Sequence, residues 1–381
     1  MWDAIVLGLG GMGSAAAAHI AARGKKVLGL EQFTPAHDRG SSHGSSRIIR
    51  QAYFEDPAYV PLLLRAYELW HDLETQSDEP LYLRTGGLMV GPTDSVLVQG
   101  SLRSAREHGL DHELLSAADI ARRFPATAPR DGEVAVFEKP AGILFPEACV
   151  RAHLKRATAD GAELRFGTPV DAWRADEGSV EVTLVSGERC RAEHLVVCAG
   201  AWLPRLAADM ELPLLVERNV MHWFQPASHP ELFGPDRLPV YILDRGQRFM
   251  LYGFPDVAKA GIKAAFHHSD QFTTPQELNR TISTAEIDKL RAALVQWLPD
   301  GGGKHLAAAV CMYANTPDLH FVIGRHPRHH NVIVAGGFSG HGFKFCAVAG
   351  ELLAELAFDG TSSKPIYLFS PQRFKKERQP T

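Results

Sequence analysis

Three glycines near the start of the chain have the spacing of a phosphate-binding turn. Gly8, Gly10 and Gly13 follow a short apolar run and precede an alanine-rich stretch with helical character. Glycine at these positions lets the backbone turn tightly and approach a pyrophosphate, which then sits at the N-terminus of the helix. Glu31 ends the next apolar run and is placed to accept hydrogen bonds from a ribose diol. The pattern predicts a dinucleotide-binding site.

The rest of the chain favours FAD over NAD as that dinucleotide. No second glycine fingerprint follows, so we expect no separate NAD domain. Two further apolar runs end in glycine, at residues 196–200 and 334–337. FAD spans a whole domain and needs several such close approaches of the backbone. Because no nicotinamide site is built in, the electrons of a bound FAD must leave to oxygen or to an external acceptor.

A pair of arginines could bind a carboxylate. Arg47 and Arg50 are three residues apart, so on a helix they would share a face. An arginine can hold a carboxylate through two parallel hydrogen bonds. An exposed basic helix with surface ion pairs would show the same spacing. Small residues dominate positions 40–46 just before the pair, which suits backbone packed against a cofactor.

Three further positions could contribute to redox chemistry. Residues 336–344 form a glycine-rich loop that enters a helix, so free N–H groups and Lys344 could stabilise negative charge on a reduced flavin. The alternative is an ordinary strand–turn–helix junction with a solvated lysine. Lys263 lies in an apolar, strand-like stretch, where lysine is rare. It either faces the flavin and assists oxygen reduction or points to water from an edge strand. Cys311 is either an inert buried thiol or a residue with a special role.

Composition excludes several other classes of protein. The 381-residue chain has a formal net charge of −4, so we expect no nucleic-acid partner. Five dispersed cysteines do not form a disulfide framework and predict a cytoplasmic protein. No apolar run is long enough to span a bilayer, so no membrane partner is expected. No metal-binding spacing and no GxSxG sequence occurs, which predicts neither a metal site nor serine-hydrolase chemistry.

The order of apolar runs predicts a mixed α/β fold. The first 30 residues read as a strand, a helix over 14–23 closed by Gly24, and a second strand. We expect a discontinuous Rossmann-like FAD-binding domain, interleaved with a substrate domain built on a mostly antiparallel sheet. The FAD-binding domain is predicted to comprise residues 1–80, 145–215 and 305–381, and the substrate domain residues 81–144 and 216–304.

The segments described above resemble the family of monomeric sarcosine oxidase, N-methyltryptophan oxidase and L-pipecolate oxidase. The resemblance covers nearly the whole chain, and the motifs occur in the family's order and at compatible spacing. It is carried by the N-terminal fingerprint and by residues 42–53, 252–255, 261–263, 311–313, 316–318 and 337–344. The resemblance implies FAD-dependent oxidation of N-methyl or cyclic secondary amino acids, which gives an imine and hydrogen peroxide.

The resemblance also implies roles for individual residues. Cys311 would hold the flavin 8α-methyl group through a thioether, and Lys263 would be the oxygen-activating cation. Arg50 and Lys344 would bind the substrate carboxylate. Tyr252, His267 and Tyr313 would line the substrate cavity, and His43 and Arg47 would lie near the flavin ring. The residues expected to contact FAD are Gly8, Gly10, Gly13, Glu31, Ser42, His43, Arg47, Val170, Gly200, Cys311, Gly337, Gly340, Gly342 and Lys344.

The chain departs from the sarcosine-oxidising members at three positions. Ser45 and Gly324 each stand where those members have an acid, and His268 adds a second histidine beside His267. The core set of residues is retained, so these departures concern the identity of the amine. A monomer that uses a small amino acid and molecular oxygen is expected. Two alternatives stay open: a dehydrogenase of the same fold with a quinone or protein acceptor, and a flavin-binding protein without turnover.

Overall fold

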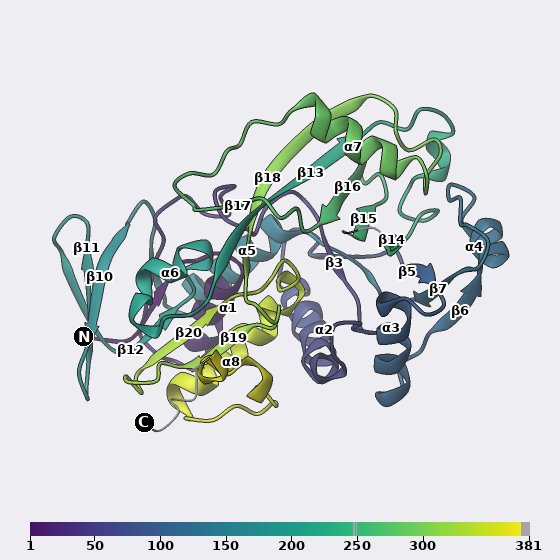
Figure 1. Cartoon of the computed structure of the whole chain (residues 1–381). Helices are drawn as coiled ribbons and strands as arrows, with labels where there is room; N and C mark the ends of the chain where they lie inside the picture. The colour runs from purple at the N-terminus through teal and green to yellow at the C-terminus, as the bar shows by residue number, and fades with distance from the viewer. Residues whose placement is uncertain (247, 249, 375–381) are drawn as a thin grey trace, which may run out of the picture.

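The computed structural model describes residues 1–246, 248 and 250–374. The last seven residues of the predicted segment 305–381 therefore lie outside the described residues. Two large sheets organise the chain (Figure 1). One contains the N-terminal strands, and the other includes the long strands that run along the top of the view.

The first sheet is built on a parallel core that starts at the N-terminus. Strand β1 (Trp2–Leu7) pairs in parallel with β2 (Val27–Leu30) and with β12 (Arg189–Val197). Its remaining strands are β9 (Glu163–Arg165), β10 (Val170–Ala175), β11 (Val180–Leu184), β19 (Val322–Arg325) and β20 (Val332–Gly336). The order is β10-β11-β12-β1-β2-β9, with β20 beside β12 and β19 beside β20. The β-α-β unit expected in the first 30 residues is confirmed.

Helices that pack closely on one another cover this sheet. Helix α1 (Gly11–Ala22) contacts α5 (Pro146–Ala159) and α8 (Cys346–Phe358), and α2 (Val60–Glu74) contacts α8. Alanines on α1 allow these helices to pack close to it. At Gly13, a Cβ atom would lie 1.7 Å from the carbonyl oxygen of Gly8. The third glycine of the fingerprint is therefore required by the contact between helix and strand.

The second sheet is mostly antiparallel, as the sequence predicted. Its strands are β5 (Gly87–Pro92), β6 (Glu113–Ser116), β7 (Glu133–Glu138), β13 (Leu215–Phe224), β14 (Val240–Leu243), β15 (Met250–Phe254), β16 (Ile262–His267), β17 (Phe272–Thr273) and β18 (His305–Asn315). The order is β17-β13-β16-β15-β14-β5-β7-β6, and β18 pairs with β13. Among the described pairs of this sheet, β14 with β5 is parallel and the others are antiparallel. Its helices are α3 (Val96–Glu107), α4 (Ala117–Arg123) and α7 (Thr284–Leu294).

A small third sheet completes the fold. It contains β3 (Arg47–Ile49), β4 (Tyr82–Arg84) and β8 (Gly142–Leu144), in the order β3-β8-β4. Helix α6 (Leu203–Leu206) follows β12. The short 3₁₀ helices are η1 (Pro57–Tyr59), η2 (Gly200–Trp202), η3 (Ala208–Met210), η4 (Pro230–Leu232), η5 (Phe343–Phe345), η6 (Tyr367–Phe369) and η7 (Pro371–Phe374).

One segment does not follow the predicted division of the chain. Strand β18 falls within residues 305–381, which we assigned to the FAD-binding domain, but it pairs along its whole length with β13 of the second sheet. The physical reason is that sheet membership depends on long-range pairing, which an apolar run does not specify. We keep two interleaved domains as a proposal and place β18 in the second. In the described part of the chain, no helix has the length and apolarity needed to cross a bilayer.

Candidate active site

One large cavity is lined by residues from both sheets. Its atom-free space, which includes open solvent at the mouth, is about 2000 Å³. The predicted site residues that line it are Gly8, Gly10, Glu31, Ser42, Arg47, Arg50, Val170, Gly200, Tyr252, His267, Cys311, Tyr313, Gly337, Gly340, Gly342 and Lys344. Gly13, His43 and Lys263 are not among its lining residues. The structure therefore brings together most of the predicted residues.

The N-terminal fingerprint forms one end of this cavity. Gly8 has a φ of +83°, and a Cβ there would lie 2.6 Å from the carbonyl oxygen of Cys198. Gly10, the N-cap residue of α1, has no side chain to cap the helix, and Ser42 Oγ accepts from the Gly11 amide at 3.1 Å. The amides that follow in the first turn can receive a phosphate. Glu31 accepts hydrogen bonds from the backbone amides of Leu9 (2.9 Å) and Phe33 (3.0 Å).

Glu31 is held as a carboxylate. Burial acts to raise its pKa, but hydrogen bonds from His37 and the two amides outweigh burial and lower it. An ionised carboxylate is the better acceptor for the hydroxyl groups of a ribose. Together with the first-turn amides of α1 and the glycine turn, it gives this end of the cavity the donor and acceptor set that a dinucleotide requires.

Two buried cations line the cavity. Arg50 is 1% exposed, and its guanidinium donates to Glu55 Oε2 (2.6 Å) and to the Ala52 carbonyl (2.9 Å), while its buried Nε has no partner in the described structure. Lys344 is 6% exposed, and its Nζ donates to the His341 carbonyl at 2.7 Å. Burial, followed by the nearby charge of Arg50, lowers the pKa of Lys344 to about 7. This arrangement can bind a carboxylate.

The predicted pairing of Arg47 with Arg50 on a helix is wrong. Arg47 lies on β3 and Arg50 directly follows that strand. Residues three apart in extended chain point to opposite faces. The Arg47 guanidinium donates to the carbonyls of Ser46 and Ser41, both at 2.8 Å. Arg47 therefore orders the segment before β3, and the second cation beside Arg50 is Lys344.

Three aromatic side chains from neighbouring strands form a wall of the cavity. Tyr252 comes from β15, His267 from β16 and Tyr313 from β18. The ring of His267 lies 5.6 Å from that of Tyr313 and 6.4 Å from that of Tyr252. Burial lowers the pKa of His267 well below its usual value and raises the pKa of Tyr252 to about 12. At neutral pH this wall is uncharged.

Cys311 lies beside these aromatic rings with its thiol free. It lines the cavity and packs in one cluster with Met221, Ala265 and Tyr313. Burial raises its pKa, with the charges of Arg47 and Lys263 acting in the opposite direction. A buried, protonated thiol is unreactive toward most reagents. Its packing against Tyr313 and Tyr252 of the aromatic wall is therefore the feature that separates it from Cys198 and Cys346, which also line the cavity.

Lys263 is buried, which excludes the alternative of a lysine that points to water, but it does not line the cavity. It is 2% exposed, and its Nζ donates to the carbonyls of Gly44 (2.7 Å) and Ser46 (2.8 Å) and to Ser46 Oγ (3.0 Å). Burial lowers its pKa well below the usual value. His43, which directly precedes Gly44, has a buried Nε2 without a partner in the described structure, and burial lowers its pKa to about 4.

Sequence reasoning missed two acids that hold the Arg50 segment. Glu55 lines the cavity and pairs with Arg50. Glu138 is fully buried, and its Oε2 accepts from the backbone amides of Gln51 (2.8 Å) and Ala52 (2.9 Å). Glu55 is only five residues from Arg50, which is a weak signal. Nothing local marks Glu138, because it lies 86 residues from Ala52.

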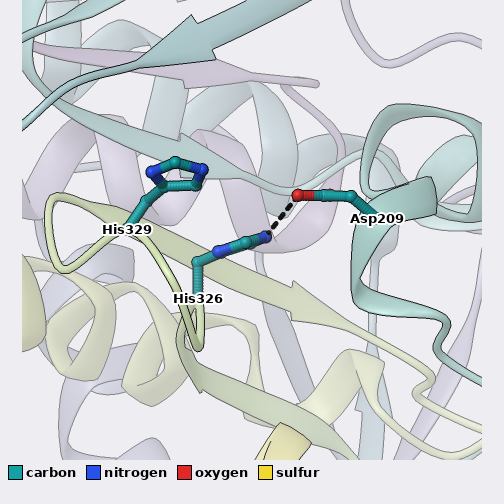
Figure 2. A group of neighbouring side chains, drawn as sticks. All are labelled: Asp209, His326 and His329. Atoms are coloured by element: carbon teal, nitrogen blue, oxygen red, sulfur yellow. Dashed lines mark ion pairs between the residues drawn. The ribbon is translucent and has the colours of Figure 1, made fainter.

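A cluster outside the cavity contains three possible metal ligands. Figure 2 shows Asp209, His326 and His329 facing one another, with His326 Nε2 3.1 Å from an Asp209 oxygen. The same oxygen pairs with the guanidinium of Arg328. His326 Nδ1 accepts a hydrogen bond from the backbone amide of Arg328 at 3.2 Å. A neutral His326 then carries its proton on Nε2, so its free lone pair is not directed at the cluster. These contacts form an ion pair between Asp209 and Arg328 with His326 beside it. The absence of a metal stays a prediction.

Comparison with known proteins agrees with this site. The family model described as FAD dependent oxidoreductase matches residues 3–356. A monomeric sarcosine oxidase of Streptomyces avermitilis is 50% identical over 375 residues, covering 98% of this chain and 97% of the relative. An N-methyl-L-tryptophan oxidase of Salmonella arizonae is 35% identical, covering 98% and 100%. The fold and the cavity define a flavin-dependent oxidoreductase. This chain belongs to the FAD dependent oxidoreductase family, within the group that contains these two oxidases.

Solved structures share the fold. NikD, an unusual amino acid oxidase essential for nikkomycin biosynthesis, has a TM-score of 0.85 with 24% identity and 97% coverage of both chains. An L-proline dehydrogenase from P. horikoshii has a TM-score of 0.84 with 22% identity, covering 98% of this chain and 97% of the other. The mixed α/β FAD-binding fold expected from the sequence is confirmed.

The pKa of Lys344 predicts a pH-dependent affinity for carboxylates. Below about pH 7 its ammonium is charged, and as the pH rises through that value the free protein loses this charge. The Kd of acetate should therefore rise above pH 7, by up to about tenfold per pH unit. Perturbation of the flavin absorbance between about pH 6 and 9 measures it.

Two variants separate the two cations in this test. Lys344→Met should bind acetate weakly and with little dependence on pH. Arg50→Ala should also bind weakly, and its pH dependence should move to higher pH, because the charge of Arg50 contributes to the lowered pKa of Lys344. A wild-type Kd that is constant over this range would contradict the assignment of Lys344.

Proposed function

We propose that this protein oxidises N-methyl or cyclic secondary amino acids with FAD and oxygen. The products are an imine, which water converts to an aldehyde or ketone and an amine, and hydrogen peroxide. The observation that carries the proposal is the pair of buried cations, Arg50 and Lys344, in the same cavity as Cys311 and the aromatic wall. A buried cation pair favours a carboxylate ligand. The two relatives, named as oxidases of sarcosine and N-methyl-L-tryptophan, support a secondary amino acid.

Bound FAD supplies the two-electron oxidation of the carbon next to nitrogen and passes the electrons on to oxygen. The residues that would hold it are the glycine turn with Glu31 at one end and Cys311 with the loop at 337–344 at the other. The chain's own side chains supply position and charge. Arg50 and Lys344 hold the carboxylate, which fixes the orientation of the amine.

The uncharged wall suits the form of the amine that reacts. An ammonium has no lone pair to assist loss of electrons, so the amine must be neutral when it reacts. His267 is uncharged because burial lowers its pKa. Tyr252 and Tyr313 are held as neutral phenols because burial raises theirs. The wall excludes water and offers no anion that would stabilise the ammonium form.

We assign Cys311 as the covalent attachment point and Lys263 as the cation that assists oxygen reduction. Cys311 lies in the cavity wall, and Lys263 is a buried amine whose hydrogen bonds reach the segment at 44–46. His43 and Arg47 flank this segment and would support the flavin ring. Oxygen as acceptor is proposed here, and the monomeric state and cytoplasmic location stay predictions.

The proposed function is tested by anaerobic bleaching of the flavin with a panel of amino acids. Sarcosine, N-methyl-L-tryptophan, L-proline, L-pipecolate and glycine cover the relevant shapes. We expect bleaching by at least one secondary amino acid and, in air, one hydrogen peroxide per turnover. Bleaching without peroxide would indicate another electron acceptor. No bleaching by any secondary amino acid would contradict the proposal.

The covalent link is tested by acid precipitation of the flavoprotein. We expect yellow colour in the wild-type pellet and its loss to the supernatant in Cys311→Ala. Cys346→Ala is the matched control, because Cys346 is also a buried cysteine that lines the cavity. Colour wholly in the wild-type supernatant, or the same loss from both variants, would show that Cys311 is not the attachment point.

The role of Lys263 is tested by measuring the two half-reactions separately. Lys263→Met should slow reoxidation of the flavin by oxygen by about 10²-fold or more, as when one preorganised charge is removed. Reduction by substrate should change by less than about threefold, since Lys263 is not part of the cavity lining. Stopped-flow absorbance measures both rates. Equal losses in the two half-reactions would remove the oxygen role.

A further inference from the structure

A buried carboxylate lies beside the aromatic wall of the cavity. Glu217, on β13, is 1% exposed, and its Oε2 lies 2.8 Å from Nδ1 of His268. Asn315 Nδ2 donates to the same oxygen at 2.6 Å. The other oxygen accepts from the backbone amides of Ser269 (2.5 Å) and Asp270 (2.8 Å). One carboxylate thus joins β13, the end of β18 and the turn after β16.

The turn that this carboxylate holds has an unusual backbone. His268 has a φ of +75° and Asp270 a φ of +58°, both in the left-handed region that non-glycine residues rarely adopt. Such strain persists only where surrounding contacts over-determine the conformation. Here the hydrogen bonds from the turn to Glu217 supply those contacts. The turn begins immediately after His267, so its shape determines where β16 ends.

Glu217 and His268 also contact the wall itself. Glu217 is the cross-strand partner of Tyr313. The His268 ring lies 4.3 Å from the ring of His267 and perpendicular to that of Tyr313 at 5.6 Å. His267 and Tyr313 line the cavity, whereas Glu217 and His268 do not. Two of the three side chains of the wall, His267 and Tyr313, therefore rest against a support that does not line the cavity.

Glu217 is ionised at neutral pH. Burial acts to raise its pKa, but the hydrogen bonds from His268 and from the Ser269 amide outweigh burial and lower it to about 2. An ionised, buried carboxylate needs donors on both oxygens, and the turn, His268 and Asn315 supply them. The position of the turn therefore depends on the charge of Glu217 as well as on the packing of the side chains around it.

We infer that Glu217 and His268 are positioning residues that fix the wall formed by His267 and Tyr313 and thereby set which substrate sizes the cavity accepts. The inference rests on the proposed function of this cavity. Neither residue reaches the reacting atoms, so their loss should weaken binding and alter size preference more than it slows the chemical step.

Variants that remove the contact in different ways test this role. Glu217→Gln removes the charge at nearly constant volume. His268→Gly removes the ring at a position whose φ suits glycine, and His268→Asn keeps a donor and tolerates the left-handed backbone. Anaerobic flavin reduction by sarcosine and by N-methyl-L-tryptophan gives a limiting rate and a half-saturating concentration for each variant.

We expect half-saturation by the preferred substrate to rise about tenfold in Glu217→Gln and His268→Gly, with the limiting rate within about threefold of wild type. The preference between the small and the large substrate should change by at least about fivefold. His268→Asn should recover much of the wild-type behaviour. The double variant Glu217→Gln with His268→Gly should be no worse than the more affected single variant, because both remove one contact.

Glu133→Gln is the matched control. It removes the buried ion pair between Glu133, on β7 of the same sheet, and Arg245, whose atoms lie 2.7 Å apart. Neither residue lines the cavity. The substitution should lower thermal stability and leave size preference unchanged. Wild-type preference in Glu217→Gln and His268→Gly, or changes that Glu133→Gln reproduces, would overturn the inference.

Binding of acetate and of indole-3-acetate, two carboxylates of different size without an oxidisable amine, separates this inference from the proposed function. A changed ratio of their Kd values in His268→Gly supports the positioning role even if no amino acid bleaches the wild-type flavin. An unchanged ratio contradicts the positioning role even if wild-type bleaching confirms the oxidase.

Discussion

The burial of two positive charges in one cavity is the constraint on which the rest of this structure depends. Arg50 and Lys344 are removed from water, and a buried cation is tolerated only when it is paired or can lose its proton. Glu55 pairs with Arg50, and Lys344 responds with a pKa lowered to about 7. A bound carboxylate would complete the charge balance. The site therefore selects for an anionic group at one fixed place, which is what an enzyme for amino acids requires.

The fold meets this constraint by bringing together segments that are distant in sequence. Arg50 follows a short strand of the third sheet, and Lys344 lies in the 3₁₀ turn that leads into α8. The aromatic wall and Cys311 come from the second sheet, while the glycine turn comes from the first. The Glu217–His268 pair supports the wall from outside the cavity. Carboxylate binding, cofactor binding and substrate shape thus belong to different layers of the structure that meet at one cavity.

Local features of this protein could be predicted from sequence, and long-range ones could not. The glycine turn follows from a pattern within a few residues, and the structure agrees with it. The apolar stretch around Lys263 left open whether this side chain is buried or points to water, and the structure shows it buried. The arginine pair was placed on a helix because spacing alone does not distinguish i, i+3 on a helix from the same spacing in extended chain. The pairing of β18 with the second sheet could not be predicted, because its partner, β13, lies about 90 residues earlier. Glu138 and Glu217 were missed because a single acid carries no periodic signal, and their partners become neighbours only in the folded chain.

A crystal structure of the flavin-loaded protein with acetate bound would test the central claim most directly. The account predicts one acetate with its oxygens within hydrogen-bonding distance of the Arg50 guanidinium and of Lys344 Nζ, and its methyl group directed toward the wall of Tyr252, His267 and Tyr313. An acetate bound elsewhere in the cavity, with both cations keeping only the protein partners described above, would contradict it.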